Sequence, residues 1–332
     1  MITAVERSCG CDAAPRRLCE ACYAAGDTFA ACSLACLDRH QQAHEDSAAR
    51  RGAARARWLL AAVNAKSPDS VARFTAHRAR LSQLLERAAG GRLAVLGAGN
   101  ACDLDLPWLV QRFSEVHLVD FDEAALERAR ARAPADVRAR LVLRGGVDLS
   151  GLLDELDAWG EPGAFPDVAT LGARAVAVAR GLVAELGVFD VTLSACVLSQ
   201  LVLPFRSAWV APAATWANLG AALQAIHLAT LAGTTARQGV LAFDVQSSRS
   251  APALAAFDAG ADQSLEQLVA RETAAGRLRL SPEPRAIMAQ LGAPGLSKLV
   301  ASPRLSAPWL WDLGETRQLV YALEFERPQP GA

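Results

Sequence analysis

The chain of 332 residues has almost no net charge and no long apolar run, and both absences exclude classes of protein. Its 34 basic residues face 35 acidic ones, for a formal net charge of −1 at pH 7. Broad nucleic-acid surfaces need an excess of positive charge, so nucleic acid is not a favoured partner. No apolar stretch reaches the ~20 residues of a membrane span. The opening residues also lack a signal-peptide core. The sequence therefore predicts a soluble, cytoplasmic protein without a membrane partner.

Cysteine is scarce after residue 36. Six of the eight cysteines lie between Cys9 and Cys36, and only Cys102 and Cys196 follow them. In a small secreted domain such a cluster would indicate disulfide bonds. Here it heads a long chain and is followed by histidines at ligand spacing, so bound zinc is the better interpretation.

Potential metal ligands recur at every fourth residue of the stretch ACSLACLDRHQQAHE. Four residues advance a helix by about 400°, so these side chains would share one face. With the preceding cysteines they form four close pairs, and eight ligands fill two tetrahedral zinc sites. The candidate ligands are Cys9, Cys11, Cys19, Cys22, Cys32, Cys36, His40 and His44. Four protein ligands leave no position for water, so both zinc ions are predicted to be structural.

Residues 1–46 resemble the MYND-type and related HIT-type zinc fingers, on CEAC, on FAACSLACLDRHQQAH and on the order of the pairs. The resemblance implies interleaved ligands, with the first and third pairs on one zinc and the second and fourth on the other. Such fingers usually bind proteins or brace a neighbouring domain, which leaves a protein partner open. Residues 47–66 are predicted to form a helical linker with arginines on a solvated face, or in contact with a phosphate.

A strand-turn-helix-strand pattern begins with LAVLG (93–97), a short apolar run suited to a strand buried on both faces. The turn GAGN and the helix LPWLVQRF follow, and then EVHLVD, a second strand that ends on Asp120. Asp122 is expected to cap the next helix. The dinucleotide fingerprint G-x-G-x-x-G is absent, because its third glycine would fall on Cys102.

The wider run VLGAGN…VHLVDFD resembles the class I S-adenosylmethionine-dependent methyltransferases. The resemblance implies that Gly97 and Gly99 let the backbone pass the methionine moiety and that Asp120 accepts hydrogen bonds from both ribose hydroxyls. Phe121 would pack on adenine, and Asp148 would meet its amino group. The cofactor-binding residues that the resemblance implies are Arg73, Gly97, Ala98, Gly99, Asn100, Asp120, Phe121, Asp148 and Ser194.

Later segments follow the order expected of that family. ARLVLRGGVDLSG, GVFDVTLSACVLSQL and QGVLAFDVQSS are predicted as further strands, and two strands around GETR as a closing hairpin. The expected fold is α/β, with a Rossmann-like, seven-stranded, mostly parallel sheet that ends in an antiparallel hairpin. This methyltransferase domain would span 67–332, preceded by the small N-terminal zinc-finger domain.

Catalytic residues are less clearly marked, because no Asn-Pro-Pro-like run follows the fourth strand. The candidates are His77, Gln200, Ser199 and His227. Ser199 and Gln200 could hydrogen-bond the acceptor. His77 would face it from the helix before the first strand, where Arg73 would pair with the cofactor carboxylate, unless both lie on a solvated face. His227 has apolar neighbours, which favours a packed histidine over a base.

The sequence thus predicts an enzyme that transfers a methyl group from S-adenosylmethionine and holds two structural Zn²⁺ ions. A small-molecule acceptor is slightly favoured, since neither a basic patch nor a macromolecule-specific motif is visible in the domain. One alternative is a protein or RNA methyltransferase recruited through the finger. Another is a non-catalytic interaction protein whose Rossmann domain senses the cofactor.

Overall fold

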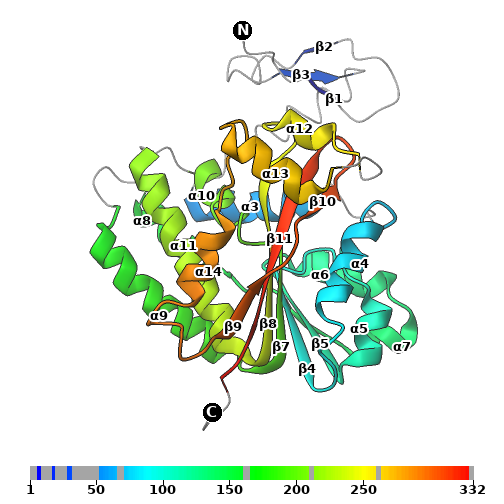
Figure 1. Ribbon diagram of the computed structural model, residues 1–332. Coiled ribbons are helices and arrows are strands. Elements are labelled where there is room, and N and C mark those ends of the chain that lie inside the picture. The colour runs from blue at the N-terminus through cyan, green and yellow to red at the C-terminus, as the bar shows by residue number, and fades with distance from the viewer. Residues whose placement is uncertain are drawn as a thin grey trace.

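The computed structural model describes most of the chain after residue 51 and three short strands before it. The described residues are 6–8, 17–18, 28–31, 52–65, 71–159, 165–208, 213–258 and 263–328. Most of them build one large sheet with helices on both faces (Figure 1). None of the helices in these stretches combines the length and the apolar character that a membrane crossing requires.

The large sheet has the order β10-β11-β8-β7-β4-β5-β6, and β9 also pairs with β11. Its strands are β4 (Arg92–Leu96), β5 (Glu115–Val119), β6 (Leu141–Arg144), β7 (Phe189–Ala195), β8 (Thr235–Ser247), β9 (Ala301–Leu305), β10 (Trp309–Asp312) and β11 (Arg317–Glu326). The strands from β6 across to β8 are parallel, whereas β11 is antiparallel to its three neighbours. The structure therefore confirms the α/β class and the antiparallel C-terminal strands.

The sheet has eight strands where the sequence predicted seven, because two short strands, β9 and β10, pair with β11. Between them lie Ser306, Ala307 and Pro308, and proline has no N–H to give to a ladder. The Ser306 side chain compensates in part, since its Oγ accepts a hydrogen bond from the Ala322 amide at 2.9 Å. The predicted hairpin therefore stands beside one further short strand.

The order of the parallel strands places a switch point at β4. The chain goes from β4 through β5 to β6 on one side, and then returns to add β7 and β8 on the other. In open α/β sheets, the loops at the carboxyl ends of the strands part at such a point and leave a crevice for a ligand.

Helices cover both faces of the sheet (Figure 1). Those on one face are α4 (Thr75–Leu84), α5 (Leu106–Arg112), α6 (Glu123–Arg132) and α7 (Ala135–Arg138). Those on the other are α9 (Val168–Leu186), α11 (Ala213–Thr234) and α14 (Pro284–Leu291). The shorter elements are η1 (Leu153–Glu155), α8 (Leu156–Trp159), α10 (Leu203–Ala208) and α12 (Pro252–Ala255), and α13 (Leu265–Ala274) is a longer one.

Side-chain caps fix where several helices begin. Asp122 accepts a hydrogen bond from the Ala125 amide at 3.1 Å, which confirms it as the N-cap of α6. Asp105 caps α5 in the same way through the Trp108 amide. Ser264 and Gln267 form a reciprocal capping box at α13. These polar residues mark helix starts because they satisfy backbone N–H groups that have no partner within the helix.

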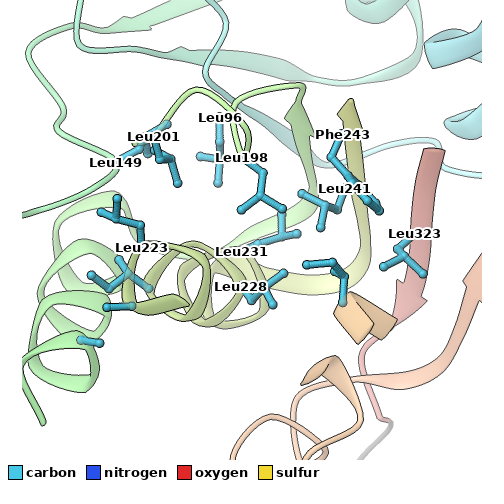
Figure 2. Close-up of a cluster of buried hydrophobic side chains, with 14 of the residues drawn as sticks. Leu96, Leu149, Leu198, Leu201, Leu223, Leu228, Leu231, Leu241, Phe243 and Leu323 are labelled. Atoms are coloured by element: carbon cyan, nitrogen blue, oxygen red, sulfur yellow. The ribbon is translucent and has the colours of Figure 1, made fainter. Parts of the chain in front are cut away.

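The sheet buries a separate apolar cluster on each face. One cluster lies between the sheet and α9, α11 and α14, and Figure 2 shows Leu96, Leu228, Leu231, Leu241 and Phe243 at its centre. The other joins Val95 and Leu193 to Leu81, Leu109 and Leu126 on the opposite helices. Because β4 contributes to both clusters, its strand end is held from both sides.

Helix α3 (Gly52–Ala65) lies in the segment predicted as a linker, but it packs on the domain. Ala53 and Ala56 are buried, and the Ala53 amide donates to Asp157 Oδ1 at 3.0 Å. Arg57 stays exposed and pairs with Asp154. The sequence indicated only the solvated arginine face, because small alanines give no strong apolar stripe.

A separate three-stranded sheet, with the order β1-β3-β2, lies in the segment predicted as a zinc finger. Its strands are β1 (Glu6–Ser8), β2 (Arg17–Leu18) and β3 (Thr28–Ala31). β1 runs parallel to β3, and β2 runs antiparallel to it. All eight candidate zinc ligands lie outside the described residues, so the two zinc sites stay a prediction.

Candidate functional site

A pocket of about 320 Å³ lies at the carboxyl ends of the parallel strands. Loops after β6, β5, β4 and β7 line it in the order in which those strands lie in the sheet, and β10 and α3 close it. Its wall is formed by Leu59, Leu60, Asn64, Phe74, Gly97, Ala98, Gly99, Asn100, Ala101, Cys102, Asp103, Asp120, Phe121, Val147, Asp148, Leu149, Ser150, Leu153, Ala195, Val197, Gln200, Leu201, Leu203, Pro204, Trp311 and Leu313. The pocket is thus at the switch point of the sheet.

Glycine is required in the turn after β4. Gly97 has φ +75°, and a Cβ there would lie 2.6 Å from the Val197 Cβ. Gly99 has φ +48°, and its amide donates to Asp120 Oδ2 at 2.8 Å. The absent side chains keep the turn close to the β7 loop and leave its backbone open to the pocket.

Asp120 follows β5 directly, and its carboxylate faces that glycine turn. Besides the Gly99 amide, it accepts a hydrogen bond from the Asp122 amide on Oδ1 at 2.9 Å. Burial raises the pKa of Asp120, because a charge is less stable away from water. The Phe121 amide contributes a further backbone hydrogen bond. A carboxylate has about four acceptor positions, so acceptor capacity remains for a donor of a ligand.

Three arginines and α3 fasten the loop between Gly97 and Asp103. Arg78 donates to the Cys102 carbonyl at 3.0 Å, and Arg128 Nε donates to Asn100 Oδ1 at 2.9 Å. Arg132 donates to the Asn100 carbonyl. The Asn100 amide group donates to the Asn64 carbonyl of α3 at 2.7 Å. The loop is therefore fixed by side chains that do not depend on a ligand.

The β6 side of the pocket is an apolar slot with one carboxylate. Phe121, Val147, Leu149 and Leu153 line it. Asp148 lines it as well, but its oxygens accept hydrogen bonds from the Ser150 and Leu153 amides, each at 2.9 Å. A flat apolar ring would fit between these side chains.

The β7 side of the pocket is almost entirely apolar. Its wall includes Val197, Leu203, Phe74 and Trp311, and Gln200 provides an amide. Gln200 Nε2 donates to the Cys196 carbonyl at 2.9 Å, and no hydrogen bond from a described residue occupies its amide oxygen, which can therefore accept from a ligand. Cys196 is buried, as expected for a small packed side chain, and burial raises the pKa of its thiol well above the usual value.

The two histidine candidates do not line the pocket. His77 is buried against Trp311, with the ring centroids 4.2 Å apart, and Trp309 Nε1 donates to its Nδ1 at 3.0 Å. His227 is buried beside Ser194, with Nε2 2.7 Å from the serine Oγ. Burial lowers the pKa of His77 to about 3 and that of His227 to about 4, so both are neutral near pH 7.

Three more predicted residues lie outside the pocket wall. Ser194 has no exposed surface and bonds His227 behind the β7 loop. Ser199 donates to Asp244 on β8. Arg73 donates to the Leu313 carbonyl at 3.2 Å and stays at the rim.

The structure therefore assembles only part of the predicted set in the pocket wall. The predicted residues that line it are Gly97, Ala98, Gly99, Asn100, Asp120, Phe121, Asp148 and Gln200. Asp103, Phe74 and the α3 residues Leu60 and Asn64 line it without having been predicted as site residues. The only sequence signal for Asp103 was its position where the turn enters α5. Among the described residues no cluster of His, Cys, Asp or Glu could hold a metal ion.

No family model and no curated protein matches the chain. Among solved structures, the chain is similar to the methyltransferase domain of bacterial CtHen1, with 13% identity over 75% of this chain and 96% of that one, at a TM-score of 0.41. Magnesium protoporphyrin IX methyltransferase from Synechocystis PCC 6803, with bound SAH, shares 12% identity over 77% and 83%, at 0.36. The YcgJ protein of Bacillus subtilis shares 10% over 77% and 99%, at 0.39. All three structures share little sequence with the chain, and each TM-score is below 0.5.

Proposed function

We propose that the protein is an S-adenosylmethionine-dependent methyltransferase. The observation that carries this proposal is the partly buried Asp120 carboxylate at the switch point, which faces a glycine turn without side chains. A vicinal pair of ribose hydroxyls would donate to the remaining acceptor capacity of this carboxylate. The slot beside Phe121 and Leu149 would take the adenine ring.

The residues present fit this cofactor. A side chain at Gly97 would fill the space along the turn, and no cation neutralises Asp120 among the described residues, as expected of a site for neutral hydroxyls. The volume of about 320 Å³ lies at the lower end of the range for small-ligand pockets. When bound, the cofactor supplies an electrophilic methyl group on a sulfonium.

The chain's own contribution would be position and the exclusion of water. In-line displacement gains most of its rate from holding the reacting atoms in line. The apolar wall of Phe74, Leu203 and Trp311 would enclose the acceptor beside the methyl group. Gln200 would orient it through a hydrogen bond, whereas the neutral, buried His77 and His227 reach no ligand in the pocket.

A small-molecule acceptor fits the β7 side better than a macromolecule. Helix α3 and the β10 side chains enclose that side with apolar groups, and Gln200 is its main polar contact. A protein or RNA substrate recruited through the finger is the second candidate, favoured by the protein-binding habit of the zinc fingers that residues 1–46 resemble. A cofactor-sensing protein without catalysis is the third.

Transfer of a labelled methyl group separates these candidates. The protein would be incubated with methyl-labelled S-adenosylmethionine and cell extract split by molecular size. Label in the low-mass fraction supports a small acceptor, and label in protein or RNA supports recruitment. Cofactor binding without any transfer would support a sensor. At limiting S-adenosylmethionine, Asp120→Ala should strongly reduce labelling in every fraction, which distinguishes transfer by this site from background.

We also propose that the N-terminal segment holds two structural zinc ions. Cys9 follows β1 directly and Cys32 follows β3 directly, and those strands are parallel. Their ends therefore lie at one edge of the small sheet, whereas β2, which precedes Cys19, runs the other way. This supports one zinc on Cys9, Cys11, Cys32 and Cys36 and the other on Cys19, Cys22, His40 and His44.

Elemental analysis tests the zinc proposal. The purified protein should contain two zinc ions per chain, and His40→Ala should lose about one of them while S-adenosylmethionine binding by the large domain persists. A His40→Ala protein with full zinc content would show that His40 is not a ligand. If His40→Ala loses activity on protein acceptors alone, the zinc finger recruits the protein substrate. If activity on every acceptor falls because KM rises, the zinc finger closes the pocket.

A further inference from the structure

The Asp103 carboxyl lines the pocket wall. Among the described residues it forms no ion pair, and the only hydrogen bond that it accepts comes from its own backbone amide. Arg78, whose charge acts on Asp103, is committed elsewhere, because Nη1 donates to the carbonyls of Val71 and Cys102 at 2.8 and 3.0 Å. A pocket carboxyl of this kind is suited to a cation that arrives with a ligand.

The order of the strands tells which part of a ligand would meet Asp103. Neighbouring strands are about 4.8 Å apart. If the adenine lies at β6 and the ribose on Asp120 after β5, the rest of an adenosyl ligand must cross the β4 loop toward β7. Asp103 is at the far end of that loop, and Cys196, after β7, feels its charge. The amino-acid end of the ligand would therefore pass Asp103.

We propose that the Asp103 carboxylate binds the ammonium group of the cofactor's amino-acid end, so that cofactor binding is coupled to the ionisation of this side chain. The inference rests on the function proposed above and names the residue that would make this pocket sensitive to pH. Asp120 recognises a neutral part of the ligand, and Asp103 recognises its charge.

The electrostatic surroundings of Asp103 support this coupling. Burial raises the pKa of Asp103 to about 7, and the negative charge of Asp120 adds to the effect, while Arg78 on α4 opposes it. The other titratable groups nearby are Cys196 after β7 and Asp244 on β8, and the charges of Asp103 and Asp244 both raise the pKa of the Cys196 thiol. In the free protein, Asp103 is therefore about half protonated near pH 7. A bound ammonium would favour the ionised form and expel the proton.

This gives a quantitative expectation for binding. If only the ionised carboxyl binds the ammonium, the apparent affinity falls about tenfold for each pH unit below the pKa and levels off above it. Between pH 6 and pH 8 the affinity for a ligand with the amino-acid end should rise about tenfold. Binding near pH 6 should release close to one proton.

Two probes isolate the amino-acid end. S-adenosylhomocysteine carries adenine, ribose and the ammonium-bearing chain, whereas 5′-methylthioadenosine lacks that chain. Calorimetry at pH 6, 7 and 8 should give the tenfold rise for S-adenosylhomocysteine and little change for 5′-methylthioadenosine. Because both probes contact Asp120, any titration of that carboxyl would affect them equally and is subtracted by the comparison.

Variants assign the effect to one side chain. Asp103→Asn keeps the shape and removes the charge, and it should weaken S-adenosylhomocysteine about 10- to 100-fold at pH 8, flatten its pH profile and leave 5′-methylthioadenosine within threefold. Asp105→Asn is the matched control. It removes a carboxylate two residues away, outside the pocket wall, and asparagine still caps α5. It should behave like the wild type.

The outcomes separate this inference from the proposed function. If 5′-methylthioadenosine binds but S-adenosylhomocysteine binds equally at pH 6 and pH 8, the role of Asp103 is overturned and the adenosyl site stands. If Asp103→Asn weakens both probes alike, Asp103 does not read the amino-acid end, and the inference also falls. If neither probe binds the wild-type protein, the adenosyl site itself is wrong.

Discussion

The two ends of the pocket hold their ligands by different means. At the β4–β6 end, backbone N–H groups fix the carboxylates of Asp120 and Asp148. Three arginines also fasten the loop between Gly97 and Asp103. At the β7–β10 end the wall is apolar except for Gln200. The first end is built to recognise donors and a ring at fixed positions, and the second selects by shape. A change at one end should leave the other end largely intact.

The largest effect is expected where the two ends meet. Gly97→Ala would place a methyl group 2.6 Å from the Val197 Cβ at a φ of +75°. Left-handed strain and overpacking together should lower the free energy of unfolding by about 2–4 kcal/mol. Denaturant unfolding measures the loss. Adding Val197→Ala removes the overpacking and should restore part of the lost free energy of unfolding. If the double mutant shows no such recovery, backbone strain alone causes the loss.

Asp120→Ala tests the polar end alone. Without the carboxylate, two ribose hydroxyls and the Gly99 and Asp122 amides lose their acceptor, at a cost of about 2–3 kcal/mol. Affinity for S-adenosylmethionine should fall about 30- to 150-fold by calorimetry. Unchanged affinity would remove Asp120 from the site and with it the distinction between the two ends.

Asp103→Asn should also change the stability of the empty protein. The folded-state pKa of about 7 lies above the ordinary value of 3.8, so the unfolded chain releases this proton first and wild-type stability falls as the pH rises from 4 to 7. Asp103→Asn has no carboxyl to ionise at this position, so its stability does not fall for this reason as the pH rises. Its melting temperature should exceed that of the wild type by a few degrees at pH 8, with the gap closing toward pH 4 in thermal scans.

The smallest effect should come from Gln200→Ala at the apolar end. Gln200 is exposed, and its side chain donates to the Cys196 carbonyl. Losing one hydrogen bond to the acceptor should slow transfer about fivefold, equivalent to about 1 kcal/mol, with cofactor affinity within twofold. Labelled-methyl transfer and calorimetry would be run on the same preparation. A large drop in cofactor affinity would mean that the two ends are not separable.

The sequence predicted the polar end well because that end is local. The apolar run that begins at Leu93, the glycine turn and Asp120 after the next strand lie within 28 residues, from Leu93 to Asp120. Strand pattern and turn chemistry are enough to place them at one edge of a sheet. The structure confirms that arrangement.

The apolar end could not be predicted in the same way. Phe74 and Trp311 meet at 5.1 Å between ring centroids although the whole domain separates them in the chain. The burial of His77 could not be predicted from local sequence either, because its hydrogen-bond partner Trp309 is 232 residues away. Helix α3 packs on the domain through small alanines and lines the pocket with Leu59, Leu60 and Asn64, residues that also suit a linker. Each of these contacts depends on tertiary packing, which no local pattern encodes.

The broken strand at the C-terminal edge of the sheet has a consequence for how copies of the molecule meet. An exposed edge with a long row of free N–H and C=O groups invites pairing with the edge of another chain. Here Pro303 lies within β9, Ser302 beside it has a φ of 50°, and Pro308 separates β9 from β10. The opposite edge, β6, is only four residues long. Neither described edge of the large sheet presents a long, regular strand with which another chain could pair. The fold therefore disfavours edge-to-edge aggregation.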